Sequence, residues 1–584
     1  MNQNMSENLD CCLGFHQTSQ NLFMKLFSKH LTRSLITCVL TASLQAAPRF
    51  TGDVELKLNP NPAAPLAGIL TFESSGPVTV TLAGQSGQHT FNIVYGPDKN
   101  PAEGLPIVGM YADRNYNFEV KISDSSGQTN YNGSLSLRTP PLPDRPELMP
   151  RIETEIADAK SIANGYTLFN PRRRIPIEVE NAISAESQFN MEFGMLAVVD
   201  AEGKVVWYYH GDSRITDYRP ISNGNIVFIT SDNRLIEIDM LGNTVASWCA
   251  SQRPDPENKG CPEGSIPVDV PTFHHSFQEY PNGDFLILST EVRNVPGYFT
   301  SEQQANAPRK TQQVVGDVVI RMNRQGEILW QWKAFDHLDP YQIGYLTFSS
   351  YWVRRGFPNT VDWSHANAVR IVDDGDAFLV NFRLISGIAK VDVASQEIEW
   401  LAITDPEEVK KEHRDKTFKL TQGKWFWMPH APWITDEGNL LIFNNDNFGA
   451  RPFTPSLPPS AIRSRAEEYE IDEEKRELRK VWQSRFPNER PMRSWAMGSV
   501  QPLSNDNVLV GYGMMLVDKG IEKINWPDRL RHPAWTQIRE YTKTDPAELV
   551  WSLTLLPLTE ETEIGWTIYG GLRVPNWPPT GYSE

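Results

Sequence analysis

The chain has 584 residues, of which 40% are hydrophobic and 10% aromatic, so its length allows either two domains or one large repeat architecture. The formal net charge of −17 at pH 7 argues against nucleic acid as a partner, because affinity for phosphate depends on Lys and Arg side chains. An anionic ligand would therefore need a local positive site. The 43 prolines, 38 glycines and 17 tryptophans favour many short strands separated by turns, and we expect an all-β fold.

Residues 1–47 have the layout of an export signal. A basic segment that includes Lys25 precedes an apolar run over residues 35–44, and small residues follow at the expected cleavage position. The run is too short to cross a bilayer. We therefore predict a periplasmic protein that loses its signal and has no membrane partner. Residues 1–23 are either an over-extended start of the reading frame, which Met24 favours, or a leader of unknown purpose.

Two cysteines remain after the signal is removed, Cys249 and Cys261. Eleven residues separate them, and in an oxidising compartment such a pair predicts a disulfide that closes a small loop. The alternative is two unrelated buried thiols. The export signal favours the disulfide.

Residues 48–145 predict a small β-sandwich domain. Apolar and polar residues alternate in short runs, for example over residues 54–58 and 78–82, and a period of two residues is typical of half-buried strands. A proline-rich segment over residues 139–143 predicts a stiff linker at the end of this domain. We recognise no functional site in it.

Residues 146–584 contain an internal repeat that decides the predicted fold. One half of the unit is an acidic or polar turn followed by a strand that ends at or near a tryptophan, and the other half is a turn that leads into an apolar strand. The first half occurs six times and the second half five times, which predicts a six-bladed β-propeller of four-stranded blades. We expect residues 565–569 to close the ring by joining the blade that begins near Met195. The six tryptophans are Trp207, Trp248, Trp330, Trp400, Trp482 and Trp551.

Three of the repeats place a histidine shortly before the turn of the second half. His275 and His430 lie eight residues before the turn glycine, and His365 lies ten residues before it. The strand before this turn is the innermost one in a propeller, so equivalent positions on different blades converge on the central channel. A lone histidine in a strand is more often structural, but three at one repeat position indicate a site.

A cluster of histidines allows two kinds of chemistry. Imidazoles bind zinc or copper, which would make the protein a metal-dependent propeller hydrolase or oxidase. They also supply a nucleophile and proton carriers for cleaving an ester of an anionic acid. Arg383, on the strand after the His365 turn, favours the ester, because a guanidinium binds a tetrahedral oxyanion in a bidentate manner. No Asp or Glu accompanies the histidines in their short motifs, so we expect no metal site. A third hypothesis is a propeller that binds sulfated or aromatic ligands without turnover.

The combined motifs resemble the bacterial PAPS-independent arylsulfate sulfotransferase family. The resemblance is carried by the His-His pair before a Pro-Asn-Gly turn, by residues 362–367 with Arg383, and by residues 429–433. It implies a small N-terminal β-domain before a six-bladed propeller, and it suggests a homodimer. It also implies a ping-pong reaction without a cofactor, in which a sulfuryl group passes from an aryl sulfate donor through a sulfohistidine to a phenolic acceptor.

The resemblance assigns roles to single residues as well. His430 matches the nucleophile of the family, and the repeat register favours His275 over its neighbour as the histidine that faces the sulfate. The residues expected around the sulfate are one of His274 and His275, together with His365, Asn367 and Arg383.

Two further features concern substrate binding. Trp363 and Trp433 neighbour the histidine motifs, and we expect them to form walls for the aromatic part of a substrate. The basic cluster over residues 171–174 could bind an anion, but in an acidic protein we interpret it as a solvated loop tip. The sequence contains no phosphate loop or dinucleotide motif.

Overall fold

The structure is a computed structural model of the chain. The predicted export signal lies outside the described residues except for its last two positions, and so do Cys11, Cys12 and Cys38. Within the described part, no helix combines the length and apolar character that crossing a membrane requires. The structure describes residues 46–175, 190–254, 260–484, 492–516, 524, 526, 529, 531–556 and 564–579.

The N-terminal part forms two antiparallel sheets with one common core. Side chains along β3 alternate between buried and half-buried positions, as the period of two residues predicts. Leu70 and Ile107 from one sheet pack with Val80 and Ile122 from the other, which makes this part a β-sandwich. The first sheet contains β1 (Glu55–Leu58), β2 (Gly68–Thr71) and β5 (Leu105–Ile107), and the second contains β3 (Thr79–Ser86), β4 (His89–Tyr95), β6 (Asn115–Asp124), β7 (Gly127–Asn130) and β8 (Leu135–Arg138).

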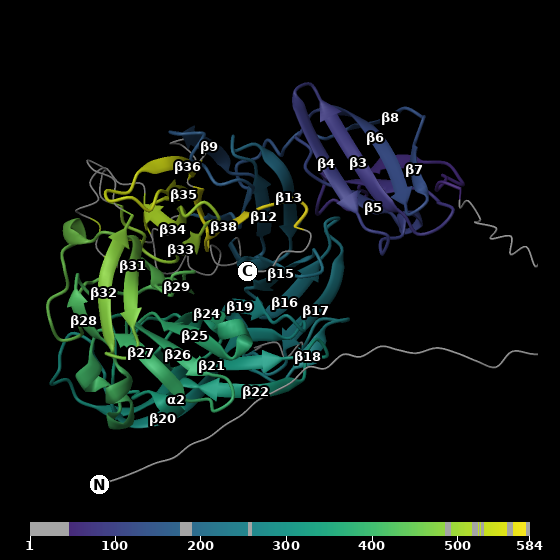
Figure 1. The fold of residues 1–584 in the computed structure, drawn as a ribbon. Coiled ribbons are helices and arrows are strands. Elements are labelled where there is room, and N and C mark those ends of the chain that lie inside the picture. Colours follow the sequence, from purple (N-terminus) through teal and green to yellow (C-terminus); the bar gives the residue numbers. More distant parts are fainter. Residues whose placement is uncertain are drawn as a thin grey trace, which may run out of the picture. The chain divides into compact units, whose positions relative to one another are not determined.

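The rest of the described chain folds into a series of antiparallel sheets, each built around four strands (Figure 1). Six such sheets occur in the described residues, and each of the last five uses four strands that are consecutive in the sequence. This confirms the predicted all-β fold, in which a small β-domain precedes a propeller in the sequence. From the inside outward, the sheets are β38 (Gly571–Val574), β10 (Tyr166–Phe169), β12 (Gly194–Val199) and β13 (Val205–Gly211); β14 (Ile215–Pro220), β15 (Ile226–Thr230), β16 (Arg234–Ile238) and β17 (Thr244–Ala250); β19 (His274–Glu279), β20 (Phe285–Tyr298), β21 (Lys310–Met322) and β22 (Ile328–Lys333); β24 (Ala366–Val372), β25 (Ala377–Phe382), β26 (Gly387–Asp392) and β27 (Ile398–Ile403); β29 (His430–Ile434), β30 (Leu440–Asn444), β31 (Arg465–Asp472) and β32 (Glu477–Gln483); and β33 (Ser499–Pro502), β34 (Val508–Leu516), β35 (Ala534–Tyr541) and β36 (Leu549–Leu556).

The innermost strands contact one another in succession and close a ring. β14 contacts β19, β19 contacts β24, β24 contacts β29, β29 contacts β33, and β33 contacts β38. The ring closes where the hydroxyl of Tyr218 on β14 donates to the carbonyl of Gly570, next to β38, at 2.7 Å. The first sheet combines both ends of the propeller, because β38 pairs with β10 from Tyr166–Val574 to Phe169–Gly571. The closing strand is therefore Gly571–Val574 and not residues 565–569. Part of that segment forms β37 (Gly565–Thr567), which pairs instead with β11 (Arg172–Arg174).

A second ring of contacts runs along the outermost strands. In each of the six sheets, a tryptophan donates its indole N–H to the turn that precedes the outermost strand of the next sheet. In five sheets this is the tryptophan of the sequence repeat, but β22 uses the buried Trp332 in place of the partly buried Trp330. The six bonds are Trp207 to Met240 O, Trp248 to Arg324 O, Trp332 to Gln396 O, Trp400 to Glu473 Oε1, Trp482 to Thr544 O and Trp551 to Ala201 O, at 2.8–3.2 Å.

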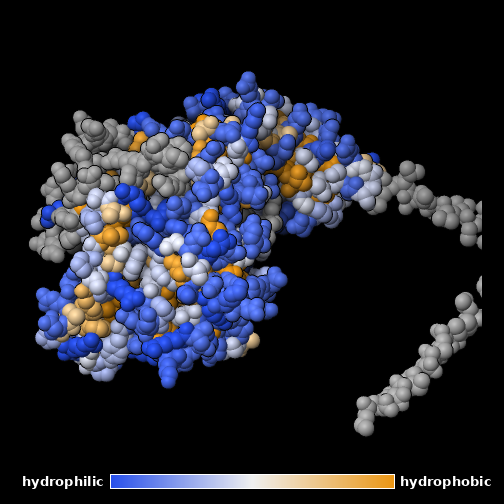
Figure 2. Space-filling view, turned by 60° about the vertical axis from the view of Figure 1, so that its left-hand side comes forward, coloured by the Kyte–Doolittle hydropathy of each residue, from blue (hydrophilic) through white to orange (hydrophobic). Residues whose placement is uncertain are grey.

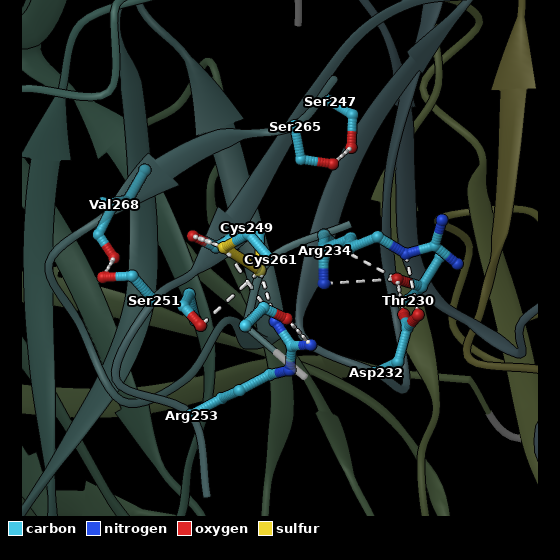
Figure 3. Close-up of a disulfide and its surroundings, with 12 residues drawn as sticks. Thr230, Asp232, Arg234, Ser247, Cys249, Ser251, Arg253, Cys261, Ser265 and Val268 are labelled. Carbon is cyan, nitrogen blue, oxygen red and sulfur yellow. Dashed lines mark hydrogen bonds and ion pairs between the residues drawn. A yellow bond between two sulfur atoms is a disulfide. The ribbon is translucent and has the colours of Figure 1, made fainter. Parts of the chain in front are cut away.

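A disulfide and a mostly hydrophilic surface complete the fold. The expected disulfide is present, since Cys249 on the outer strand β17 is bonded to Cys261 and Arg253 contacts both sulfur atoms (Figure 3). Hydrophilic residues cover most of the face seen in Figure 2, and hydrophobic residues there form only small patches.

Candidate active site

The four histidines of the predicted cluster line one cavity of about 210 Å3. β19 carries His274 and His275, His365 precedes β24, and His430 begins β29. The ring centroids of His275 and His365 are 4.9 Å apart. The residues that the repeat places at equivalent positions of three sheets therefore meet at the inner end of those sheets.

The backbone is irregular where it presents these histidines. The pairing of the innermost strand shifts between His274 and Phe277 in β19, at Ala366 in β24, and after His430 in β29. His275 and His365 have φ values of 56° and 51°, in the left-handed region that L-residues rarely adopt. Such bulges and strained residues re-aim side chains and concentrate at functional sites.

The hydrogen bonds around His430 define which ring nitrogen is free to react. Asn445 donates its side-chain amide to the carbonyls of Ser494 (3.2 Å) and Met497 (2.9 Å), so its Oδ1 must act as an acceptor. This Oδ1 lies 2.6 Å from Nδ1 of His430, which must then carry the proton and leave the lone pair on Nε2. Burial, together with the nearby Arg383, lowers the pKa of His430 to about 3, and the imidazole is neutral near pH 7.

His365 is held in a similar way by a carboxylate. Its Nδ1 donates to Oδ2 of Asp362 at 2.5 Å, and Oδ1 of Asp362 accepts the indole N–H of Trp352 at 3.0 Å. Burial lowers the pKa of His365, and Asp362 opposes that shift. The pair resembles a base and its orienting carboxylate, with the Nε2 lone pair of His365 available.

The adjacent histidines differ in orientation. The rings of His275, His365 and Tyr351 contact one another, and the hydroxyl of Tyr351 is 3.1 Å from Nε2 of His275. His274 turns its Nε2 to the carbonyl of Ser289 at 2.9 Å. His275 is thus the member of the pair whose ring contacts His365, and both histidines line the cavity.

Positive charge dominates the cavity. Burial lowers the pKa of Arg383 to about 10, so the guanidinium keeps its charge at neutral pH. None of the ion pairs within the described residues involves Arg172, Arg355, Arg383 or Arg529, and no described Asp or Glu lines the cavity. Such a site suits an anionic ligand. The arginines along the cavity wall are Arg172, Arg214, Arg354, Arg355, Arg383 and Arg529.

The sequence predicts the basic cluster over residues 171–174 to be a solvated loop tip, and this prediction is wrong. The cluster forms β11, which pairs with β37 near the C-terminal end of the chain, and this pairing brings Arg172 to the cavity wall. The pairing joins segments that are almost 400 residues apart. No local pattern reveals such a contact.

Three residues predicted to bind substrate do not line this cavity. Asn367 donates its side-chain amide to the carbonyl of Pro429 at 3.0 Å. Trp363 is fully buried in the hydrophobic core and donates to the carbonyl of Gln342. Trp433 lies under the guanidinium of Arg370 and, like Asn367, borders an adjoining cavity of about 70 Å3, whose wall also includes His430 and Tyr569.

Other aromatic residues form the wall in their place. Tyr351 connects the histidines with the arginines of the wall. It contacts His275, and the guanidinium of Arg355 lies 3.6 Å from its ring centroid. Its segment lies outside the repeat, in the connection between β22 and β23 (Thr360–Asp362), so the repeat register gave no signal for it. The aromatic residues of the wall are Phe273, Tyr351, Trp352, Trp495, Trp526 and Tyr569.

The histidines of the cavity are the candidate ligands for a metal ion. Within the described residues, no three His, Cys, Asp or Glu side chains are grouped so that they could hold a metal ion. The histidines instead contact one another, carbonyl groups, a tyrosine and amide or carboxylate oxygens.

Comparisons with known proteins add independent information. Residues 55–140 match the model of the arylsulfotransferase Ig-like domain. A stretch of 146 residues is 27% identical to arylsulfate sulfotransferase AssT of Lelliottia amnigena, which is 21% of this chain and 23% of that protein. The match thus spans about a quarter of the length of the curated relative.

Solved structures resemble the chain only distantly. A protein of unknown function from Bacteroides caccae covers 70% of this chain and 98% of its own at 11% identity, with a TM-score of 0.36. Lignostilbene dioxygenase of Pseudomonas brassicacearum covers 75% and 100% at 11% identity, with a TM-score of 0.32. A family model, arylsulfotransferase (ASST), matches residues 153–556 and hence most of the chain. The protein therefore belongs to the arylsulfotransferase (ASST) family.

Proposed function

We propose that the protein is an arylsulfate sulfotransferase, which moves a sulfuryl group from an aryl sulfate to a phenol by a ping-pong mechanism. The observation that carries the proposal is a neutral His430 with its lone pair on Nε2, in a cavity whose charged residues are arginines. A neutral imidazole is a competent nucleophile. Membership of the ASST family supports the same reaction class.

In the first half-reaction, Nε2 of His430 attacks the sulfur atom of the donor. The N–S bond forms as the S–O bond to the aryl group breaks, and the electron pair leaves on the phenolate oxygen. By analogy with phosphoryl transfer, the transition state is loose and places charge on the equatorial oxygens. Arg383, with Arg355 near His275 and His365, stabilises these oxygens.

In the second half-reaction, the oxygen of the entering phenol attacks the sulfur atom of the sulfohistidine. The N–S bond breaks and its electron pair returns to Nε2 of His430. The phenol must lose its proton in this step, and two histidines near the sulfuryl site are suited to receive it, namely His365 and His275. Their hydrogen-bond partners differ, since His365 is bonded to Asp362 and His275 to Tyr351.

Further parts of the proposal concern the setting of the reaction. The chemistry needs only the side chains of the cavity and two small molecules, so we include no cofactor. We also propose that the enzyme works in the periplasm as a homodimer after the loss of residues 1–47. Mass analysis of the exported protein and light scattering test these two points, and an uncleaved N-terminus or a monomer would contradict them.

Turnover of a defined donor and acceptor tests the function. The purified protein is mixed with 4-nitrophenyl sulfate and phenol, and we expect 4-nitrophenol and phenyl sulfate in equal amounts. Inorganic sulfate as the product, or activity that depends on a stoichiometric transition metal, would favour the hydrolase or oxidase instead. Binding without any product would favour a ligand-binding propeller.

A further inference from the structure

A continuous chain of hydrogen bonds leads from the cavity into the protein through the His-His pair. Nδ1 of His274 and Nδ1 of His275 are 2.8 Å apart, and Nε2 of His275 is 3.1 Å from the hydroxyl of Tyr351. At the inner end, Nε2 of His274 lies 2.9 Å from the carbonyl oxygen of Ser289. Tyr351 lines the cavity, so this chain of hydrogen bonds begins at the proposed substrate site.

The carbonyl of Ser289 at the inner end determines which nitrogen or oxygen atom carries the proton at each hydrogen bond of the chain. A carbonyl only accepts, so His274 carries its proton on Nε2 and has its lone pair on Nδ1. His275 must then donate from Nδ1, which leaves a lone pair on its Nε2. The hydroxyl of Tyr351 therefore donates to His275, and the lone pairs of the Tyr351 oxygen remain available to a ligand in the cavity.

A buried carboxylate oxygen without a partner lies at the inner end of the chain. Asp317 on β21 accepts two hydrogen bonds through Oδ2, from the hydroxyl of Ser364 at 2.5 Å and the backbone N–H of Ala366 at 2.6 Å. Its Oδ1 has no hydrogen-bond partner among the described residues and lies 3.5 Å from Nε2 of His274. A buried acceptor without a donor is costly, and this one is in place to take a proton from His274.

We propose that these four side chains form a proton relay that serves both half-reactions. The relay takes the proton of the entering phenol and returns it to the leaving phenolate in the next turnover. The inference rests on the proposed sulfotransferase activity. The members of the relay, from the cavity inward, are Tyr351, His275, His274 and Asp317.

The proton steps balance in each direction. When the phenol attacks, its proton passes to the oxygen of Tyr351, and the hydroxyl proton of Tyr351 passes to Nε2 of His275. The Nδ1 proton of His275 moves to Nδ1 of His274, and the Nε2 proton of His274 moves to Oδ1 of Asp317. When a new donor is cleaved, the same protons move back and Tyr351 protonates the departing phenolate.

Electrostatics favours the relay over His365 as the store for this proton. A proton on His365 creates a cation close to Arg383 and Arg355, both of which lower the pKa of His365. A proton on Asp317 instead neutralises a buried carboxylate. Burial raises the pKa of Asp317 to about 7, which suits reversible protonation near neutral pH. The titratable groups of the described residues that face Asp317 are His274 on β19 and Asp362 on β23.

The two half-reactions can be measured separately. Rapid mixing with 4-nitrophenyl sulfate gives a burst of 4-nitrophenolate, whose departure needs no proton, and a second mix with phenol discharges the sulfuryl enzyme. We expect Tyr351→Phe to keep the burst and to slow discharge to phenol by about 10²-fold, the range typical of general-base catalysis. Discharge to a phenol that is already ionised at pH 8 should proceed at the wild-type rate.

Control variants separate a proton relay from a structural role. Tyr280→Phe is the matched control, because the buried Tyr280 hydroxyl has no hydrogen-bond partner in the described part of the chain and the guanidinium of Arg321 packs over the ring. It should leave both steps unchanged. Asp317→Asn should slow discharge to phenol while keeping the burst, and it should remove a group titrating near pH 7 from the pH profile of discharge.

Each alternative outcome has a distinct meaning. Discharge to phenol by Tyr351→Phe within threefold of the wild-type rate would overturn the relay. Equal slowing with ionised and neutral acceptors would also overturn it, because a positioning role predicts that pattern. If the wild-type enzyme shows no burst, the proposed function itself fails, and the relay fails with it.

Discussion

The outer strands of the propeller make the same contact in every sheet, whereas the inner strands differ from sheet to sheet. On the outer strands, tryptophans from all six sheets of the described chain make the same indole hydrogen bond to the next sheet. On the inner strands, three sheets shift register beside a histidine, and His275 and His365 adopt positive φ. Regular contacts thus close the ring, whereas the irregular positions assemble the cavity. Substitutions in the two regions should therefore separate stability from activity.

The largest expected effect lies on the inner side, at His430. His430→Asn should lower the sulfotransfer rate by at least about 10⁴-fold, because no nucleophile remains to form the covalent intermediate. The free energy of unfolding should fall by only about 1–2 kcal/mol, the scale of one buried hydrogen bond. Steady-state assays and urea unfolding measure the two quantities. Retained transfer activity would remove His430 from the mechanism.

The outer side should show the opposite pattern. Trp332→Ala removes a buried indole and its hydrogen bond to Gln396, and we expect the free energy of unfolding to fall by roughly 3–5 kcal/mol with an unchanged kcat at low temperature. Trp330→Ala in the same strand is the matched control, since Trp330 is only partly buried and its indole N–H has no partner. If both variants lost the same free energy of unfolding, the stabilising role of the indole hydrogen bonds between neighbouring sheets would be contradicted.

A charge-conserving change tests the guanidinium of the cavity. Arg383→Lys keeps the positive charge but loses the planar fork, and kcat/KM should fall by about 10²–10³-fold. Arg321→Lys, whose guanidinium pairs with Asp284 away from the cavity, should leave kcat/KM unchanged. A fall for both variants would indicate a general effect of arginine loss.

The last expected effect is a pH dependence of stability. Burial raises the pKa of Asp317 from 3.8 to about 7, so between these values the folded state holds a proton that the unfolded state has lost. The Asp317 contribution to the free energy of unfolding therefore falls as the pH rises from about 4 to 7, at no more than about 1.4 kcal/mol for each pKa unit. Asp317→Asn should gain stability relative to the wild type between pH 4 and pH 8 in urea titrations. Parallel curves for the two proteins would contradict this.

The sequence predicted the elements that repeat. Turns and tryptophans recur at similar intervals because each sheet packs against its neighbours in the same way. This regularity revealed the propeller and the positions of His275, His365 and His430. The disulfide between Cys249 and Cys261 followed from their short separation. Even so, the repeat pointed to Trp330, whereas the strand geometry selects Trp332, two residues farther along the same face.

The parts that escaped prediction depend on contacts without a local pattern. Arg172 reaches the cavity because β11 pairs with a strand near the other end of the chain. Tyr351 comes from a connection that occurs once, and Asp317 on β21 lies 3.5 Å from His274 on β19 only because the two strands belong to one sheet. Trp363 neighbours the histidine motif in sequence but is buried in the hydrophobic core, because the chain bends between the end of β23 at Asp362 and the start of β24 at Ala366.

The most direct test of the account is the mass of the intact protein after it is mixed with an aryl sulfate alone. Because a ping-pong enzyme accumulates its covalent intermediate when no acceptor is present, we predict an added mass of roughly 80 Da on His430. The adduct should be absent from His430→Asn and should disappear when phenol is added. An unmodified mass under conditions in which the enzyme turns over donor and acceptor, or an adduct on another residue, would contradict transfer through His430.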